Sequence, residues 1–301
     1  MSEARLHELL RAAWARRSEL HDDESTTAYR VFHGFGEGCP GLVVDRLGPV
    51  LRARGDASFA DVLRTQYGTI SDHGLVLQEP GGATRVLGGQ VPESLVAVEH
   101  GRRFALEPLA GGNPGLYLDA RSARAWVQSH AVGRRILNLF AWTGGFGVGA
   151  LAGGARSVLH VDQQKRALAR AKANHALNEQ RIDDRDFERD DVYRFLTRAA
   201  KQGRRFGGIV IDAPPTVPGK AARDARSQDY GALVPLAREV LDDHGWIVCM
   251  FSRRDVPRSE YEHGIVSSCP DLTVVDRGQS GIDFPEDDPE RKLRFSVFSA
   301  R

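Results

Sequence analysis

Cysteine is scarce in this sequence of 301 residues, which contains only Cys39, Cys249 and Cys269. No two of them have the close, paired spacing of zinc ligands, so the sequence predicts no metal centre. Thiols that lack a partner in this way are typical of proteins in the reducing cytoplasm.

Long apolar runs are also absent. None approaches the roughly 20 residues that a membrane-spanning helix requires. The first 24 residues alternate charged and apolar side chains and lack the apolar centre of a signal peptide. Hydrophobic residues make up 41% of the chain and charged residues 27%, as in soluble globular proteins. We therefore expect a cytoplasmic protein without a membrane partner.

Neither sign of charge dominates, because the formal net charge is only +1. This balance does not indicate a polybasic protein, so any nucleic-acid contact has to come from local clusters of basic residues. Four clusters occur, at residues 204–205, 220–226, 253–258 and 291–294. Such clusters are more often solvated surface than binding sites, so their position relative to a site must decide their role.

The chain consists of two regions with different sequence patterns. Residues 1–112 combine an amphipathic helix, expected over residues 4–20, with short strands broken by turn signals, which is typical of antiparallel hairpins. The GGNPG run at 111–115 has the composition of a hinge. Residues 113–301 alternate strands and helices, which predicts an α/β fold with a doubly wound, Rossmann-like sheet. We therefore expect a small β-rich domain followed by a larger α/β domain.

A glycine-rich turn follows the first strand of the α/β region, within NLFAWTGGFGVGALAGGA (138–155). Glycines here let the backbone approach a ligand, and the next helix favours an anionic group at its N-terminus. Asp162 ends the following strand, where an acid can bind both ribose hydroxyls. Dinucleotides and S-adenosylmethionine both use this plan, but the G-x-G-x-x-A match at 147–152 lies too late for a dinucleotide. The alternative is that the glycines only permit close packing.

Two further acids follow strands of the same region. In IVIDAPPT (209–216) the strand has to end near Asp212, because proline cannot donate to a sheet. Ligands of open α/β sheets lie beyond the carboxyl ends of the strands, so Asp212 is expected beside a ligand. Asp191 follows the preceding strand and is expected either to bind an adenine amino group or simply to cap a helix.

In order and spacing, NLFAWTGGF, HVDQQKRAL with ANHALN, and IVIDAPPT resemble the bacterial 23S rRNA methyltransferases that use S-adenosylmethionine. That family has cytosine-5 and guanine-N7 members. NPGLYLDARSARAWV (113–127) is similar to the segment just before the family's cofactor domain, and GEGCPGLVVDRLGPVL (36–51) to its small β-rich domain. The resemblance covers residues 34–300 and implies S-adenosylmethionine as cofactor and RNA as partner. One departure is Ala213, since the family usually has Asp-Pro-Pro where this chain has Asp-Ala-Pro-Pro.

Carried over position by position, the resemblance also implies a set of site residues. The residues at the methionine end of the cofactor and in its pocket are Tyr117, Arg121, Asn138, Phe140, Thr143 and Gly144. Asp162 is implied to bind the ribose and Asp191 the adenine. Asp212 is implied to lie between the sulfonium and the target base, with Pro214 in the same wall.

The methylated atom depends on whether a thiol is available. Cytosine C5 becomes nucleophilic only after a cysteine thiolate adds at C6. In the cytosine-5 enzymes that the chain resembles, this cysteine follows the fifth strand, where this sequence has Phe-Ser-Arg-Arg (251–254). Cys249 lies in the apolar run WIVCMF and is expected to be a small buried hydrophobe. Methyl transfer to cytosine C5 is therefore the least favoured reaction.

Guanine N7 carries its own lone pair and needs no covalent catalyst, which makes it the favoured target. Arg253 or Arg254 is expected to hydrogen-bond guanine O6 or to contact a phosphate, the alternative being an exposed surface pair. An exocyclic amine ranks second, because Asp212 and the proline carbonyls can accept its hydrogens. However, Thr216 is not the aromatic residue that normally follows such a motif.

Two other function classes stay open from the sequence. One is a methyltransferase that acts on a protein or a small molecule, and the other is an RNA-binding relative that has lost turnover. The sequence does not decide the target nucleotide, the choice between free rRNA and an assembling subunit, or the oligomeric state, which includes a homodimer.

Overall fold

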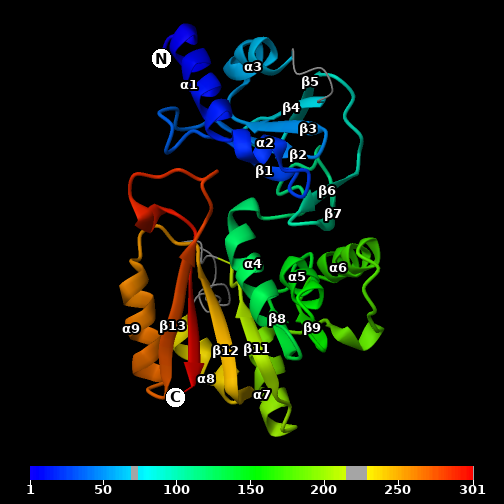
Figure 1. Cartoon of the computed structure of the whole chain (residues 1–301), viewed down its shortest axis with the longest axis vertical. Coiled ribbons are helices and arrows are strands. Elements are labelled where there is room, and N and C mark those ends of the chain that lie inside the picture. The colour runs from blue at the N-terminus through cyan, green and yellow to red at the C-terminus, as the bar shows by residue number, and fades with distance from the viewer. Residues whose placement is uncertain (69–73, 215–228, 301) are drawn as a thin grey trace. The chain divides into compact units, whose positions relative to one another are not determined.

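Two compact units make up the chain in the computed structural model, which describes residues 1–68, 74–214 and 229–300. The first unit is Met1–Arg121 with Gly281–Asp287, and the second is Ser122–Ser280 with Asp288–Arg301 (Figure 1). The segment 281–287 therefore belongs to the first unit, although it joins two strands of the second. The division into functional domains at residues 112 and 113 stays a prediction.

The first unit opens with helix α1 (Glu3–Arg16), which Ser2 caps by accepting a hydrogen bond from the main-chain N–H of Arg5. Its buried face consists of Leu6, Leu10 and Ala13, which confirms the amphipathic helix expected at this end of the chain. The remaining elements of the unit are α2 (Ser18–Asp22), β1 (Ala28–His33), β2 (Val43–Leu47), β3 (Val50–Arg54), η1 (Ala57–Phe59), α3 (Ala60–Tyr67), β4 (Gly74–Gln78), β5 (Thr84–Gly88), β6 (Leu95–Glu99), β7 (Arg102–Leu106) and η2 (Leu118–Ala120).

The main sheet of this unit has the strand order β1-β2-β3-β4-β5. Its neighbours pair antiparallel, as expected, except for β3 and β4, which are parallel. The expectation of antiparallel hairpins is wrong for this pair because α3 lies between the two strands in the chain and serves as a crossover. Strands β6 and β7 form a separate antiparallel hairpin.

A buried arginine organises the polar interior of the first unit. Arg17 is 0% exposed, and each of its five N–H groups has an acceptor. Two of these acceptors are the carboxylate oxygens of Glu37, at 2.8 and 2.9 Å, and another is the main-chain carbonyl of Asp283 at 2.9 Å. Arg17 therefore joins the N-terminal helices to the segment 281–287.

The second unit alternates strands and helices. Its elements are α4 (Arg121–His130), β8 (Arg135–Leu139), α5 (Gly145–Ala152), β9 (Ser157–Val161), α6 (Lys165–Leu177), η3 (Asp184–Asp186), β10 (Phe187–Glu188), α7 (Val192–Lys201), β11 (Phe206–Ile211), α8 (Tyr230–Arg238), β12 (Leu241–Phe251), α9 (Arg258–Ser268), β13 (Leu272–Gln279), η4 (Pro289–Arg291) and β14 (Arg294–Ala300). Helix α8 ends at Arg238, and strand β12 begins shortly afterwards at Leu241.

The described strands of this unit form a sheet in the order β10-β9-β8-β11-β12-β14-β13. The pairs from β10 to β12 are parallel, and β14 runs antiparallel to both of its neighbours. The chain moves from β8 in one direction to β9 and β10, and then in the other to β11 and β12. The order reverses between β8 and β11, which is the point where open α/β sheets bind ligands. The predicted doubly wound, Rossmann-like fold is confirmed.

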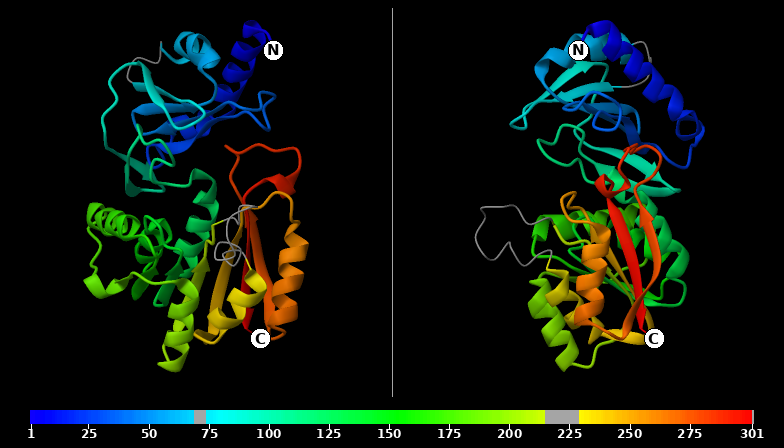
Figure 2. Two further views of the ribbon diagram at one scale, coloured as in Figure 1. Left: turned by 180° about the vertical axis from the view of Figure 1, so that it is seen from behind. Right: turned by 90° about the vertical axis from the view of Figure 1, so that its left-hand side faces the viewer.

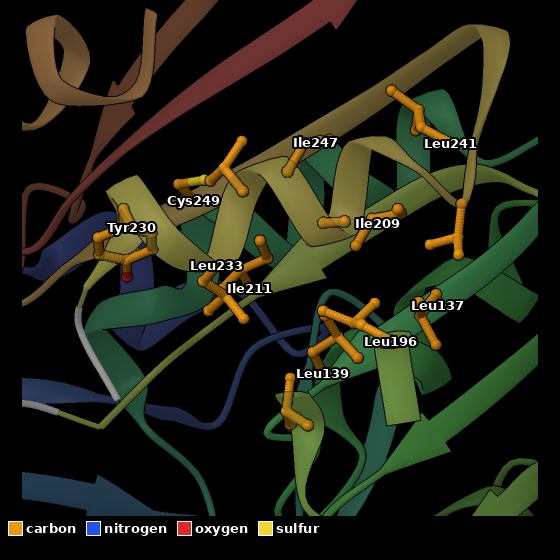
Figure 3. Close-up of a cluster of buried hydrophobic side chains, with 14 of the residues drawn as sticks. Leu137, Leu139, Leu196, Ile209, Ile211, Tyr230, Leu233, Leu241, Ile247 and Cys249 are labelled. Carbon is orange, nitrogen blue, oxygen red and sulfur yellow. The ribbon is translucent and has the colours of Figure 1, made fainter. Parts of the chain in front are cut away.

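Helices cover both faces of this sheet (Figures 1 and 2). On one face, α7, α8 and α9 pack over alternate strand residues such as Leu137, Ile209 and Cys249 (Figure 3). The residues between them lie on the other face, where His160 contacts α5 and α6 and Asn138 bonds His160. This alternation is the two-residue period of a strand buried on both sides. None of the helices in the described ranges is long and apolar enough to cross a bilayer.

Replacing Arg17 with alanine is expected to lower the free energy of unfolding by about 3–5 kcal/mol, because Glu37 then loses its buried two-point partner and three main-chain carbonyls lose a donor. Arg16 offers a matched control, since it bonds the same carboxylate at 2.6 Å from a side chain that is 53% exposed. Arg16→Ala is expected to cost less than about 1 kcal/mol. Urea unfolding of both variants tests this difference, and equal losses would contradict it.

Candidate functional site

The turn between β8 and α5 has an unusual backbone. Phe140 and Trp142 have φ values of 54° and 44°, and Gly144 has 79°. Left-handed φ is costly for a bulky residue, so the surrounding structure has to hold this turn in place. The main-chain N–H of Ala141 donates to the Val161 carbonyl at 3.1 Å, which ties the turn to the end of β9.

Asp162 is the second anchor of this turn. It is 9% exposed, and its two carboxylate oxygens accept from different main-chain N–H groups, those of Trp142 and Gln164, both at 2.8 Å. The first bond holds the turn and the second holds the entry to α6. Each oxygen has a further lone pair, so these bonds are compatible with a ribose contact. The ribose role of Asp162 stays a prediction.

Helix α6 supplies a third anchor through Asn174. This side chain is 0% exposed, and its Nδ2 donates to the carbonyl of Thr143 at 2.8 Å. Thr143 and Gly144 thus lie directly before the first N–H groups of α5, which begins at Gly145. Free N–H groups at a helix N-terminus favour an anion, so the arrangement fits the carboxylate of a methionine group.

A histidine ring fills the space beneath the glycines of α5. A Cβ added at Gly147 would lie 2.2 Å from Cε1 of His160, and one at Gly144 would lie 3.3 Å from the same atom. These glycines are therefore required for close packing, which was the alternative interpretation of the motif. His160 is itself 1% exposed and stacks on Phe187, with ring centroids 5.0 Å apart.

His160 belongs to a buried pair. Its Nε2 lies 2.8 Å from Nε2 of His175 on α6. Burial lowers the pKa of both imidazoles below the ordinary value of 6.5, and for His160 the pKa lies well below it. Both rings are therefore neutral at pH 7, and each carries one N–H. His160, Asn174 and His175 were not among the predicted site residues, although each is a polar residue within an apolar helical or strand pattern.

Asp191 caps helix α7, as one of the two interpretations of this residue expected. Its Oδ1 accepts from the main-chain N–H of Arg194 at 3.1 Å, and its Oδ2 accepts from Nε2 of Gln163 at 2.7 Å. Gln163 directly follows Asp162, so the two acids lie on adjoining loops after β9 and β10. The contact of Asp191 with adenine stays a prediction.

Asp212 follows β11 at the point where the strand order reverses, next to the end of β8. It is half-buried, Ala213 is 2% exposed within the apolar cluster under α7 to α9, and Pro214 is exposed. Ala213 therefore turns into the core, while the residues on either side of it stay accessible. Pro215, Thr216, Lys220 and the arginines at 223 and 226 lie outside the described residues.

The loop after β12 contains Arg253, whose side chain pairs with Asp255 through Nε and Oδ1 at 3.1 Å. The fully buried Arg294 donates to the carbonyls of Arg253 and Val256, which holds this loop to β14. Arg294, which belongs to the predicted basic cluster at 291–294, therefore has a structural role. The contact of Arg253 with a base stays a prediction.

All three cysteines are buried and free. Cys249 is 0% exposed among the side chains under α8 (Figure 3), and burial raises its pKa well above the ordinary value. A thiol in that state is not a nucleophile at neutral pH. The expectation that Cys249 is a buried hydrophobe is confirmed. No group of three or more metal-ligating side chains occurs in the part of the chain that the structure describes.

Tyr117 and Arg121 belong to the first unit. Tyr117 is 49% exposed, whereas Arg121 is 6% exposed and its NH2 group bonds Oδ1 of Asp283 at 2.6 Å. The NH1 group of Arg121 is buried and has no hydrogen-bond partner among the described residues. An unpaired guanidinium N–H suits a carboxylate ligand, and the cofactor roles of both residues stay predictions.

A family model for S-adenosylmethionine-dependent methyltransferases matches residues 65–299, which is most of the chain. The chain belongs to this methyltransferase family. The enzyme therefore uses S-adenosylmethionine as its cofactor, and the glycine turn, the N-terminus of α5 and Asp162 have the chemistry to hold it.

Two curated relatives carry the same name, "Ribosomal RNA large subunit methyltransferase I". That of Shigella boydii is 29% identical over 296 residues, which covers 92% of this chain and 74% of the relative. That of Erwinia tasmaniensis is 32% identical over 254 residues, covering 79% and 64%.

Among solved structures, the methyltransferase SMU.776 complexed with SAH has a TM-score of 0.90. The match covers 99% of this chain and 82% of that one. Its sequence identity is 24%, so the likeness concerns the fold alone.

Gly147→Ala is expected to lower the free energy of unfolding by about 1–3 kcal/mol and to weaken S-adenosylmethionine binding, because the added methyl overlaps His160. Gly149 on the same helix is the control, since its added Cβ meets nothing closer than 3.4 Å. Gly149→Ala is expected to be neutral or to stabilise by up to about 1 kcal/mol. Thermal unfolding and calorimetric titration measure both effects, and equal behaviour of the variants would contradict the packing role.

Stability is expected to fall as the pH is lowered below 6.5. The pKa of each buried histidine is lower in the folded protein than in the unfolded chain, so the unfolded chain binds protons first. The stability contributed by the neutral pair is thus present above pH 6.5 and is lost as the pH falls toward the folded-state pKa values. Each ring contributes at most about 1.4 kcal/mol per pH unit. Urea unfolding at pH 7.5 and 5.5 should show a smaller loss for His175→Gln than for the wild type; equal losses would count against the idea.

Proposed function

We propose that this methyltransferase modifies a base of RNA, most directly 23S rRNA, and that the favoured atom is guanine N7. The name that the curated relatives share supports ribosomal RNA as the substrate. The proposal places the enzyme in the cytoplasm, with rRNA or a pre-ribosomal particle as its partner. It also treats residues 113–301 as the catalytic domain and residues 1–112 as an accessory domain.

The observation that carries the choice of atom is the burial of all three cysteines. Cytosine-5 transfer requires a thiolate beside the base, and Cys249 points into the apolar cluster on one face of the sheet. Guanine N7 attacks with a lone pair in the plane of the ring, so the protein has only to hold the base in line. The nitrogen–carbon bond forms as the carbon–sulfur bond breaks, and no proton has to leave.

When bound, S-adenosylmethionine supplies an electrophilic methyl group on a sulfonium. Asp212 lies at the reversal point of the sheet, where its carboxylate would face a cation throughout the reaction, because the positive charge passes from sulfur to the methylated guanine. Pro214, exposed two residues later, would limit the position of the base. Arg253 would bind guanine O6 once it leaves Asp255.

Transfer of a labelled methyl group to stripped rRNA, ribosomal particles, protein and small-molecule pools tests the substrate. Nucleoside mass spectrometry then identifies the atom, and the expected product is N7-methylguanosine in 23S rRNA. Label confined to protein or small molecules would overturn the RNA proposal. Label at cytosine C5 or on an exocyclic amine would overturn the choice of N7.

Cys249→Ala is expected to keep activity within about twofold, because the thiol is buried away from the site. Loss of activity in Cys249→Ala with normal folding would restore the cytosine-5 chemistry.

Asp212→Asn is expected to lower kcat by roughly 10²-fold while the protein stays folded, because the carboxylate near the transferred charge is lost. Asp271→Asn is the control. This exposed acid precedes β13 at the opposite end of the sheet and pairs with Arg238.

A further inference from the structure

A chain of four hydrogen bonds connects strand β8 with helix α5 through the interior of the second unit. Asn138 Nδ2 lies 3.2 Å from His160 Nδ1, and His160 Nε2 lies 2.8 Å from His175 Nε2. His175 Nδ1 lies 2.6 Å from Gln180 Oε1, and Gln180 Nε2 lies 2.8 Å from the carbonyl of Val148. The asparagine and both histidines are at most 1% exposed.

The carbonyl at one end of this chain determines the direction of every bond in it. Val148 O can only accept, so Gln180 has to present its amide N–H to it and its oxygen to His175. His175 must then carry its proton on Nδ1 and, being neutral, accepts at Nε2. His160 therefore donates from Nε2 and accepts at Nδ1, where it receives the amide N–H of Asn138. The opposite order would set two acceptors against each other at Val148.

This direction leaves the oxygen of Asn138 facing away from His160. Asn138 Oδ1 is buried and has no hydrogen-bond partner among the described residues. A buried acceptor without a donor costs about 1–3 kcal/mol, so a ligand donor at this atom would be favourable. Asn138 is the last but one residue of β8, so only Leu139 separates it from the turn that leads into α5.

Among the groups of the cofactor, the methionine ammonium suits this acceptor. The N-terminus of α5 favours the carboxylate of the same methionine, and the ammonium is attached to the neighbouring carbon. Asp162, after β9, is the acid available to the ribose hydroxyls. We propose that His160, His175 and Gln180 are positioning residues that hold the Asn138 oxygen toward the cofactor's ammonium group. The proposal rests on the predicted placement of the cofactor at the glycine turn, not on the identity of the methyl acceptor.

Charged side chains surround the far end of the pair. A cavity of about 240 Å³ borders both histidines and is also lined by Arg156, Arg181, Asp183 and Asp186. The residues that line this cavity do not include the glycine turn or Asp162, so the cavity borders the pair away from the predicted cofactor position. Disruption of the chain from this side is expected to change cofactor binding without any contact with the cofactor.

The protonated nitrogens can be observed directly in the protein without cofactor. Long-range ¹H–¹⁵N spectra at pH 7.5 should show His160 protonated at Nε2 and His175 protonated at Nδ1. The opposite pair of tautomers in the wild type would overturn the proposal, and this measurement depends on no variant. Asn138→Asp should make the histidine pair take up a proton at higher pH, because an oxygen would then face His160 Nδ1.

Calorimetric titration with S-adenosylhomocysteine and with its analogue that lacks the amino group separates positioning from general support. The wild type is expected to prefer the amino compound by roughly tenfold. Gln180→Met removes the two hydrogen bonds that lie furthest from Asn138 in this series. This variant should reduce the preference to about twofold and leave the affinity for the analogue nearly unchanged. Equal weakening for both ligands would show a merely structural role and would overturn the proposal.

Asn178→Ala provides a matched control. The Asn178 amide at the end of α6 bonds the carbonyl of Asn174 at 2.7 Å and is not part of the hydrogen-bond chain from Asn138 to Val148. It should keep the wild-type preference and the wild-type histidine tautomers. These measurements use neither RNA nor turnover, so their failure is distinguishable from failure of the proposed rRNA activity.

Discussion

The imidazole of His160 lies in the space that the missing side chains of Gly144 and Gly147 leave beneath helix α5. This contact sets how closely α5 approaches the sheet, and with it where the first N–H groups of the helix point. The ring also links Asn138 on β8 to His175 on α6. A larger side chain at either glycine, or a charged ring at His160, would therefore disturb the strand, the turn and both helices together.

The fold could be predicted because its signals are local. Two-residue alternation and helical spacing are visible in short windows, so the order of strands and helices and the burial of Cys249 followed from the sequence. The parallel pairing of β3 with β4 depends on helix α3. This helix was not predicted, because the turn signals of the region indicated only short strands. The return of segment 281–287 to the first unit depends on Asp283, which is 0% exposed and bonds residues far away in the chain.

The candidate site was predictable only in part for a related physical reason. Asp162, Asp191 and Asp212 each follow a strand, and the position of an acid at a strand end can be read locally. His160 and His175 gain their significance from each other and from Gln180 and Val148, which are close only after α5 and α6 pack on the sheet. A buried histidine looks the same in sequence whether it stands alone or forms part of a directed chain.

The structural and the functional interpretations of the acids are therefore compatible. Asp162 uses one lone pair of each oxygen to hold Trp142 and Gln164, which leaves other lone pairs for a ligand. In-line methyl transfer depends chiefly on the position of nucleophile and methyl group, so a turn with strained residues at Phe140 and Trp142 is useful only if it is rigid. The same bonds that hold the strained turn thus also hold the groups that are expected to bind the cofactor. Loss of the Asp162 carboxylate would accordingly affect folding and cofactor binding together, whereas a change at Gln180 acts on binding through the orientation of the Asn138 amide.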